Sequence, residues 1–313
     1  MSESRPPISS DAIADCCGKI DMEPKPRPWL TARHHTQAMS TIGASITIAL
    51  SVLLAVGAVC AQESFREYPS IEHGWSPPFQ WDHREHAEFV VGRLMFPQSR
   101  SRYVLGAGYG DWLRGGTAWT VDYPEADRTL ARLLSRLTRM DVRAVEQPVN
   151  LDDGIDPFYW PFLISGLVGA WDLTEAQAAK LREYLLRGGF LLCDSFYGTR
   201  EWEGFVEGLE RVFPDRPIVD LPDDHPIFHL VYDLNDRPQI PTLQHLPRGY
   251  RNDGAQPHWR AVLDDDDRVM VMISYNNDIG DGWQWADEPR YPADAAHLAV
   301  ELGVNFAVYA LTH

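Results

Sequence analysis

The sequence predicts an α/β domain, a three-layer sandwich in which helices cover both faces of a mainly parallel β-sheet. Short apolar runs that suit buried strands alternate with amphipathic helical segments from residue 88 to the end of the chain. Glycines such as Gly188 and Gly189 separate the two kinds of segment. With 313 residues, 44% of them hydrophobic, the chain can bury a large core.

Apolar runs define the expected strands. Phe89-Val90-Val91 indicates the first one, and Phe190-Leu191-Leu192 indicates a fully buried one. We expect extended segments at 88–95, 142–149, 161–165, 190–194, 217–221 and 269–274. Residues 222–267 break the alternation, and we expect them to form an excursion beside the functional site.

Periodicity and capping signals define the expected helices. A leucine stripe at the i, i+3, i+4, i+7 spacing follows Pro124, which suits a first helical turn; its members are Leu130, Leu133, Leu134 and Leu137. Thr174 and Gln177 form a capping box, in which each side chain satisfies a free amide of the first turn. We expect helices at 124–139, 175–187, 202–213 and 294–311.

An uncharged segment precedes the domain. No charged side chain occurs from Ala38 to Gln62, and residues 42–61 are almost continuously apolar, which is about the length that spans a bilayer. Basic residues precede this segment and Glu63 follows it, so the positive-inside rule places the N-terminus in the cytoplasm and the body outside. Small residues around Cys60 leave a cleaved signal peptide as the alternative.

These features divide the chain into four parts: a disordered cytoplasmic tail (1–37), a transmembrane anchor or signal segment (38–61), a linker (62–87) and the α/β domain (88–313). We expect the domain to lie on the periplasmic side of the cytoplasmic membrane, or to be secreted if the leader is cleaved. The membrane would be contacted through the N-terminal segment only.

Charge and cysteine content limit the partners. Residues 1–61 carry five basic and five acidic side chains, so the formal net charge of −17 belongs to residues 62–313. Such an acidic body repels phosphate backbones and anionic headgroups, which argues against binding of nucleic acid or of a lipid surface. Cys193 is the one cysteine after the leader, so the body cannot form an internal disulfide.

Polar residues recur where the expected strands end. In an open parallel sheet, ligands bind at the carboxyl ends of the strands. The residues expected there are Arg93, Ser165-Gly166, Asp194-Ser195, Asp220 with Asp223-Asp224-His225, and Ser274 with Asp278. This recurrence is the main reason to expect a site at that edge.

The segment 115–138 adds a second group of polar residues. It places Asp122, Tyr123, Asp127 and Arg128 at the mouth of the leucine-striped helix. Few purely structural turns need that density of polar groups. Asp122 also suits a helix cap, and Asp127 and Arg128 also suit ion pairs, so structural roles remain open.

Five stretches of the sequence resemble an uncharacterised bacterial family of exported and membrane-linked proteins, domain of unknown function 4159. They are TVDYPEADR (120–128), PFLISG (161–166), LREYLLRGGFLL (181–192), DHPIFH (224–229) and LGVNFAVYALT (302–312). The resemblance covers about residues 86–312 and implies a flavodoxin-like fold of the class I glutamine amidotransferase-like type. It implies no reaction. At 194–195 the family pattern has two adjacent acids, and Ser195 replaces the second.

Several residues suggest catalysis. Asp194 or His225 could act as a general base, and Ser195 could act as a nucleophile with His225 or His229 as its base. Cys193 is expected to be a buried strand residue, because the Asp194 carboxylate beside it would raise the pKa of its thiol.

Metal or cofactor binding is less well signalled. His225 and His229, with the acids near them, could bind a metal ion together, but their spacing matches no metal-binding motif. We expect neither a metal nor a cofactor. Tyr123 and Trp283 could stack on a sugar ring, although buried aromatic residues are the commoner explanation. The segment 278–283 is expected to present acids and this tryptophan to the pocket.

The function expected from these residues is binding of a small polar or carbohydrate-like ligand in a polar pocket of an envelope protein. The alternatives are a hydrolase that uses Asp194 or His225 as general base, and a non-catalytic module that assembles with other envelope proteins. The pocket would be lined by Arg93, Asp122, Tyr123, Asp127, Arg128, Asp194, Ser195, His225, Asp278 and Trp283.

Overall fold

A mixed β-sheet forms the centre of the domain in the computed structural model, which describes residues 65–72, 87–99 and 110–313. Within these residues the sheet has seven strands in the order β2-β1-β3-β4-β7-β6-β5. They are β1 (Gly92–Met95), β2 (Gln147–Asn150), β3 (Phe162–Gly166), β4 (Phe190–Phe196), β5 (Val219–Asp220), β6 (His258–Leu263) and β7 (Val269–Tyr275). The expected α/β class with a mainly parallel sheet is confirmed.

The five strands from β2 to β7 in this order are parallel, whereas β6 pairs antiparallel with both β7 and β5. The sequence did not predict β6, which lies inside the expected excursion at 222–267. Its residues HWRAVL contain only a short apolar run at the end, and His258 and Arg260 before that run are partly exposed. A strand of this kind gives a weak pattern.

Five α-helices surround the sheet in the described residues: α2 (Glu125–Leu137), α3 (Glu175–Leu186), α4 (Gly198–Val212), α5 (Ile279–Gln284) and α6 (Ala293–Thr312). Four of them match the expected helices to within a few residues. The capping box of Thr174 and Gln177 is present at the start of α3. The short helix α5 was not expected, because six residues are too few for a periodic pattern.

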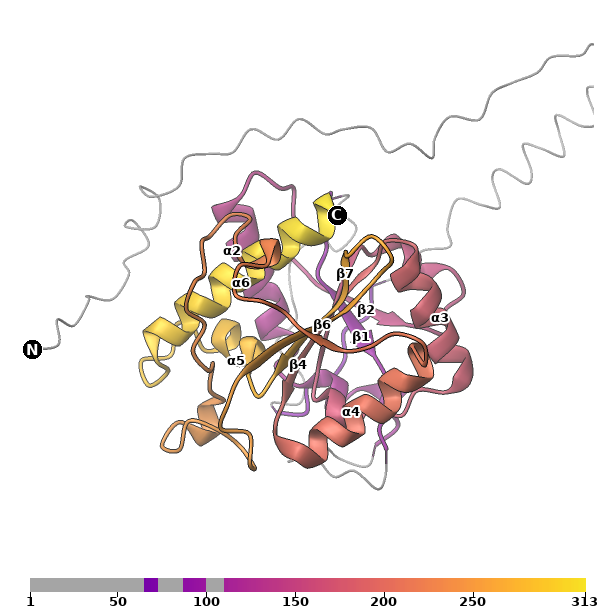
Figure 1. The fold of residues 1–313 in the computed structure, drawn as a ribbon, viewed down its shortest axis with the longest axis horizontal. Coiled ribbons are helices and arrows are strands. Elements are labelled where there is room, and N and C mark those ends of the chain that lie inside the picture. The colour runs from indigo at the N-terminus through magenta and orange to yellow at the C-terminus, as the bar shows by residue number, and fades with distance from the viewer. Residues whose placement is uncertain (1–64, 73–86, 100–109) are drawn as a thin grey trace, which may run out of the picture.

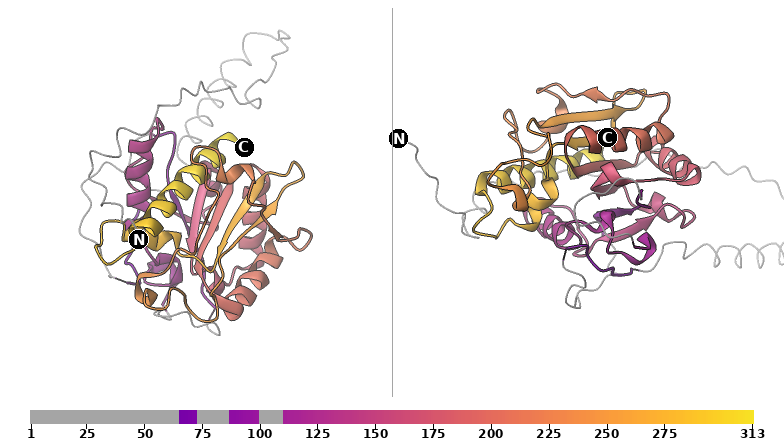
Figure 2. Two further views of the ribbon diagram at one scale, coloured as in Figure 1. Left: turned by 60° about the vertical axis from the view of Figure 1, so that its left-hand side comes forward. Right: turned by 90° about the horizontal axis from the view of Figure 1, so that it is seen from below.

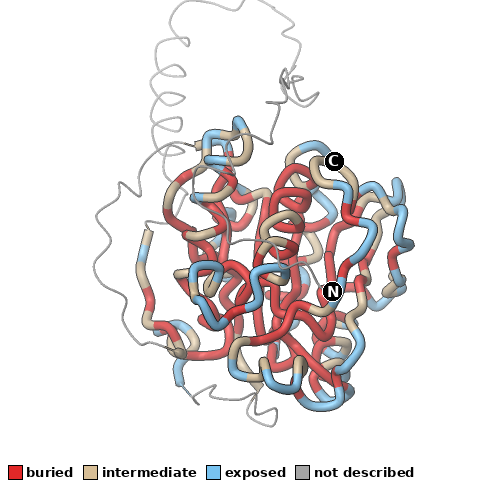
Figure 3. Tube along the Cα trace, turned by 90° about the vertical axis from the view of Figure 1, so that its left-hand side faces the viewer, coloured by how far each residue is buried: buried red, intermediate tan, exposed pale blue. Residues whose placement is uncertain are grey.

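The helices form two layers on opposite faces of the sheet, with α2, α5 and α6 on one side and α3 and α4 on the other (Figures 1 and 2). Successive side chains of a strand point to opposite faces of the sheet, so alternate residues of the central strands pack under different helical layers. Leu163, Leu191 and Cys193 join the core under α3 and α4, whereas Phe162 and Leu192 join the core under α2 and α6. Buried backbone runs through the strands and the inner sides of the helices, and exposed residues are concentrated at the periphery (Figure 3).

The connections around β1 and β3 leave on opposite faces. The helix that follows β1 is α2, whereas the helix that follows β3 is α3, and β1 and β3 are neighbours in the sheet. In open α/β folds, ligands bind beside such a reversal, at the carboxyl edge of the sheet. A functional site is therefore expected among the residues of these two loops.

The segment 65–72, expected to belong to a linker, packs against the domain. The backbone amide of Tyr68 donates to the hydroxyl of Tyr123 at 3.3 Å, and the Ser70 hydroxyl donates to the carbonyl of Thr120 at 3.4 Å. The amide of Gly116 donates to the carbonyl of Pro69 at 2.8 Å. These contacts attach the segment to the carboxyl-edge loops.

The expected tail (1–37) and the expected anchor or signal segment (38–61) lie outside the described residues. Among the residues that are described, one helix is long and apolar enough to cross a membrane, namely α6. Of its most apolar window, 61% is buried inside the domain, where α6 packs on α2 and α5. This helix is a core helix of the α/β domain.

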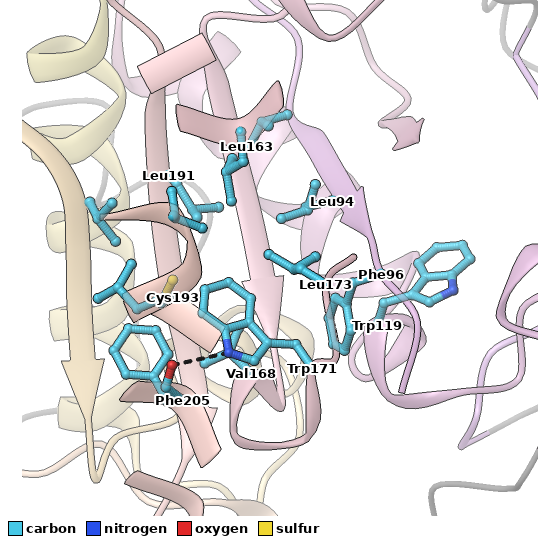
Figure 4. Packing of buried hydrophobic residues seen from close by; sticks show 14 of the residues in the cluster. Leu94, Phe96, Trp119, Leu163, Val168, Trp171, Leu173, Leu191, Cys193 and Phe205 are labelled. Carbon is cyan, nitrogen blue, oxygen red and sulfur yellow. Dashed lines mark hydrogen bonds between the residues drawn. The ribbon is translucent and has the colours of Figure 1, made fainter. Parts of the chain in front are cut away.

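Close packing of α4 on the loop after β3 gives a stability prediction. The Trp171 indole donates to the carbonyl of Phe205 at 3.1 Å, and its ring lies flat against that of Phe205 (Figure 4). A Cβ atom on Gly208 would lie 2.1 Å from the Trp171 Nε1 atom. Alanine favours a helix over glycine by about 1 kcal/mol, but overpacking costs about 1–3 kcal/mol. We expect Gly208→Ala to lower the free energy of unfolding by about 1–2 kcal/mol, measured by urea denaturation.

The control is the same substitution in a Trp171→Phe background, where the indole nitrogen is absent. The destabilisation by Gly208→Ala should then be smaller by about 1 kcal/mol. Equal costs in the two backgrounds would show that contact with Trp171 is not the cause.

Candidate functional site

Asp194 and Ser195, near the end of β4, lie at the centre of the candidate site. Ser195 has a φ angle of 57°, in the left-handed region, and the pairing of β4 with β7 shifts between Cys193 and Phe196. The shift redirects the strand so that the Ser195 hydroxyl donates to Asp278 Oδ2 at 2.9 Å. A serine held in this conformation is strained backbone, which is commonest at functional sites.

The turn after β7 carries the second part. Asp278 is the N-cap of α5, and its Oδ1 atom accepts from the amide of Asp281 at 3.2 Å. The amide of Gly280 in the same turn donates to Asp194 Oδ2 at 2.8 Å. Aspartate suits this position because its short carboxylate satisfies a free amide at the start of a helix. The turn thereby joins the ends of β7 and β4.

Asp122 forms the third part of the candidate site and lies in the loop that connects β1 to α2. Its φ angle is 58°, and its Oδ2 atom lies so close to Gly280 that a Cβ atom there would be 2.3 Å away. One carboxylate oxygen each from Asp122, Asp278 and Asp281 lies within 4.8 Å of the others. These side chains are 1–3% exposed. Asp122 does not cap α2 with its side chain, because Pro124 is the N-cap there.

Glu72 lies beside this group of carboxylates and adds to the negative potential there. Its carboxylate accepts from the amide of Asp122 at 3.1 Å and from the side chain of Gln284 at 3.1 Å, and Gln244 approaches it at 3.5 Å. The sequence did not identify Glu72, since it belongs to a segment expected to be a linker. No local motif marks it, and only the packing of residues 65–72 brings it to the site.

Burial makes the site electrostatically unusual. Burial and then the charge of Asp278 raise the pKa of Asp194 to about 8, and burial raises the pKa of Asp278 to about 6. Burial, then Asp278, raises the pKa values of Asp122 and Asp281 well above the ordinary range. The hydroxyl of Ser274 lies near Asp194 and lowers its pKa slightly, yet neither Ser274 Oγ nor Asp194 Oδ1 makes a hydrogen bond of ordinary geometry.

The nearby arginines are held in buried ion pairs. Arg93 of β1 donates to both oxygens of Asp127, at 2.8 Å and 3.2 Å, and both side chains are buried. Burial raises the pKa of Asp127 to about 6, and the Arg93 charge opposes this shift. Arg128 pairs with Glu146 at 2.8 Å. Arg93, Asp127 and Arg128, all expected in the pocket, therefore fasten α2 to the sheet.

Arg251 is a site residue that the sequence did not reveal. It comes from the excursion at 222–267, which runs beside the site as expected. Its guanidinium donates to the carbonyl of Ser195 at 3.2 Å and pairs with Glu201 at 2.7 Å. Its charge lowers the pKa of Asp278 and partly opposes the effect of burial.

The expected aromatic residues are buried rather than presented to a ligand. Tyr123 and Trp283 are 0% exposed, and the Trp283 indole donates to the carbonyl of Ala299 at 2.7 Å. Neither is free to stack on a sugar. The half-buried Trp285 is better placed, because its indole donates to Asp281 Oδ1 at 3.0 Å.

The histidines lie apart from the carboxylates. His225 begins a short 3₁₀ helix and packs near Phe228, and burial lowers its pKa while the charge of Asp224 opposes that shift. His229 bonds to Asp233 and to the carbonyl of Asp223. The structure does not bring His225 into contact with Asp194 or Ser195. β5 is the edge strand of the sheet, and β7 and β6 lie between it and β4, so the loop after β5 lies away from the end of β4.

Cys193 is buried as expected, and burial together with Asp194 raises the pKa of its thiol. It faces the core under α4 (Figure 4). A surface pocket of about 510 Å³ lies elsewhere, between α2 and α5. Its lining includes Arg128, Arg132 and Trp283 but none of the four buried aspartates. We place the candidate site at the aspartates, because the perturbed carboxylates are there and not in this pocket.

The raised pKa of Asp194 gives a pH-dependent prediction. Its folded-state pKa of about 8 exceeds the ordinary value of 3.8, so the fold favours the protonated carboxyl. The contribution of Asp194 to the free energy of unfolding is therefore fully present at low pH, and it is lost as pH rises from about 4 to about 8. Asp194→Asn keeps an oxygen for the Gly280 amide and carries no charge. We expect it to raise the free energy of unfolding at pH 8 by several kcal/mol, and to have little effect at pH 4.

The measurement is urea denaturation across this pH range in buffer free of divalent cations. The matched control is Asp287→Asn, which removes an exposed charge beyond the end of α5 and should change the profile little. Destabilisation of Asp194→Asn at pH 8 would mean that the native carboxylate is ionised and well stabilised.

Comparisons with known proteins add one finding. No curated protein matches the chain. The family model for domain of unknown function 4159 (DUF4159) matches residues 109–311, which include Asp122, Asp194, Asp278 and Asp281. The stretches of sequence that resembled this family lie almost wholly within the match. The chain, with its buried carboxylates at the carboxyl edge of an α/β sheet, belongs to the DUF4159 family.

Proposed function

We propose that the chain binds a small polar or carbohydrate-like ligand at the buried aspartates. One observation carries the proposal: Asp122 Oδ1 and Asp194 Oδ1 are buried and accept no hydrogen bond of ordinary geometry. A buried carboxylate oxygen without a donor costs free energy, and a fold retains that cost where a ligand supplies the donor. Their place at the carboxyl edge, next to the reversal between β1 and β3, supports the same conclusion.

The chemistry of the site favours particular ligand groups. Carboxylates accept hydrogen bonds, so hydroxyl, amide or ammonium groups suit them, and anionic groups do not. Trp285 offers part of an aromatic surface beside Asp281, on which the apolar face of a sugar ring could pack. The aspartates are 1–3% exposed, so a ligand larger than an ion requires side chains around them to move aside.

The cellular setting is part of the same proposal. We place the domain on the outer side of the cytoplasmic membrane, attached through residues 38–61 or released after cleavage there. The net charge of −17 supports neutral or cationic ligands over nucleic acid. We also assign the fold to the flavodoxin-like, class I glutamine amidotransferase-like type. The mainly parallel sheet between two helical layers supports this assignment.

Hydrolysis is a second candidate function, favoured by the conformation of Ser195. Its strained backbone and its bond to Asp278 Oδ2 hold the hydroxyl beside a carboxylate that could accept its proton. Asp194, with a pKa of about 8, is largely protonated at neutral pH, so it suits a general acid better than the expected general base. His225 has no part in this arrangement.

Ligand binding is tested by thermal denaturation of the full chain in mild detergent, with a panel of sugars, cell-wall fragments and amides. A ligand at about a hundred times its dissociation constant adds about 2.7 kcal/mol of stability, which gives a clear rise in melting temperature. We expect such a rise for a hydroxyl-rich compound, its loss in Asp194→Ala, and its retention in Asp287→Ala. A panel with no stabilising compound would contradict the proposal.

Hydrolysis is tested by mass spectrometry of the compounds that bind. If the second candidate function holds, Ser195→Ala should reduce turnover at least tenfold while binding persists, because the nucleophile is lost and the carboxylates remain. Turnover should also fall as pH rises through about 8, where Asp194 loses the proton that a general acid must donate. Binding without any product would reject this candidate and leave the binding function intact.

A further inference from the structure

We propose that Asp122, Asp278 and Asp281 form a binding site for a hard divalent cation, with their carboxylate oxygens as ligands. This inference rests on the proposed function for the place of the ligand, and it deepens that function by naming a ligand class. The sequence did not indicate it, since the residues that suggested a metal were His225 and His229.

The geometry of the aspartates suits such an ion. One oxygen from each of the three lies within 4.8 Å of the others. Calcium binds carboxylate oxygens at about 2.3–2.6 Å, so three oxygens spaced evenly around the ion in one plane are about 4.0–4.5 Å apart. A calcium-sized ion can therefore contact all three oxygens after at most a small contraction of the site. The smaller magnesium ion requires a larger contraction or a bridging water.

Unsatisfied oxygens form the second, independent observation. Asp122 is 2% exposed, and its Oδ1 atom has no hydrogen-bond partner. Its other oxygen lies against the backbone of Gly280, where no side chain intervenes. The oxygens of Asp278 and Asp281 each accept one hydrogen bond, which leaves further lone pairs available. A cation that contacts one oxygen of each aspartate gives all three carboxylates a further partner.

The charge balance of the site also favours a cation. Asp122, Asp194, Asp278 and Asp281 are buried together, and Glu72 adds to the negative potential at three of them. Among the described residues, the arginines that act on them are Arg93 and Arg251, and each is already paired with another acid. Buried charges persist where they are paired or coordinate a metal.

The backbone holds the ligands in place. Asp122 adopts a left-handed conformation that directs its side chain toward the turn after β7. Asp278 and Asp281 come from one turn, in which the first caps the amide of the second. Gly280 permits the close approach, because a Cβ atom there would lie 2.3 Å from Asp122 Oδ2. A site of this kind pays little reorganisation energy on binding.

Ligand chemistry selects the class of ion. Three carboxylates and no histidine or cysteine in the cluster suit calcium, magnesium or manganese, whereas zinc favours nitrogen and sulfur ligands. The rival explanation within the same geometry is a proton shared between Asp122 and Asp281, whose carboxylates lie close enough to interact directly. The two explanations differ in whether the protein binds a cation stoichiometrically.

The experiment uses the full chain in mild detergent, stripped with a chelator and titrated with Tb³⁺, Ca²⁺, Mg²⁺ and Mn²⁺ without any organic ligand. Trp285, bonded to Asp281 Oδ1, should sensitise terbium luminescence. We expect one equivalent to bind, and Ca²⁺ or Mn²⁺ to displace the terbium. Asp122→Asn should weaken binding at least tenfold, since it removes one charge at constant size. Asp287→Asn should bind as the parent does.

A parent protein that binds none of these ions stoichiometrically would overturn the inference, and so would unchanged binding by Asp122→Asn. If Asp122→Asn does not fold, as judged by circular dichroism, Gly280→Ala replaces it. Gly280→Ala displaces the Asp122 side chain and keeps every carboxylate, so it should also weaken cation binding at least tenfold.

The organic panel repeated in chelator separates the two proposals. Organic ligands that bind while no cation does would retain the proposed function and reject this inference. If a cation binds and no organic compound does, the cation site would be retained and the proposed binding of an organic ligand would be rejected.

Discussion

The contact between Gly280 and two aspartates holds the candidate site together. Its amide binds Asp194 at the end of β4, and its Cα lies against Asp122 in the loop after β1. Three segments that are far apart in the sequence therefore meet at one residue. A side chain at this position would separate them, so the arrangement of the aspartates depends on the absence of a Cβ atom there.

Burial of the aspartates carries a cost that other parts of the fold offset. Raised pKa values at Asp122, Asp194, Asp278 and Asp281 show that burial disfavours their ionised forms. The large apolar cores on both faces of the sheet provide the stability against which this cost is set. The strained backbone of Ser195 is a further cost that the fold offsets. Such strain persists where the surrounding structure holds the residue in one conformation.

The fold explains why the polar residues divide into two groups. Arg93 with Asp127, and Arg128 with Glu146, fasten the first turns of α2 to the sheet. The aspartates instead face the loops at the carboxyl edge, where the chain leaves β1 and β3 toward opposite layers. Ion pairs of the first group are complete within the protein, whereas the second group leaves oxygens without partners. That difference distinguishes a structural network from a candidate binding site.

The sequence by itself determined the α/β class, most helices and strands, the capping box at Thr174, and the family, because these follow from local periodicity and contiguous motifs. It also placed Asp194 at the end of a strand, Asp278 just after a strand, and Asp122 at the start of the leucine-striped helix. Tertiary structure alone added β6, Glu72 and Arg251, buried Trp283, and placed His225 beside the edge strand of the sheet. The physical reason is that sequence periodicity depends on residues close together along the chain. The burial and pKa of a carboxylate depend on residues that are distant in the sequence and become its neighbours only when the chain packs.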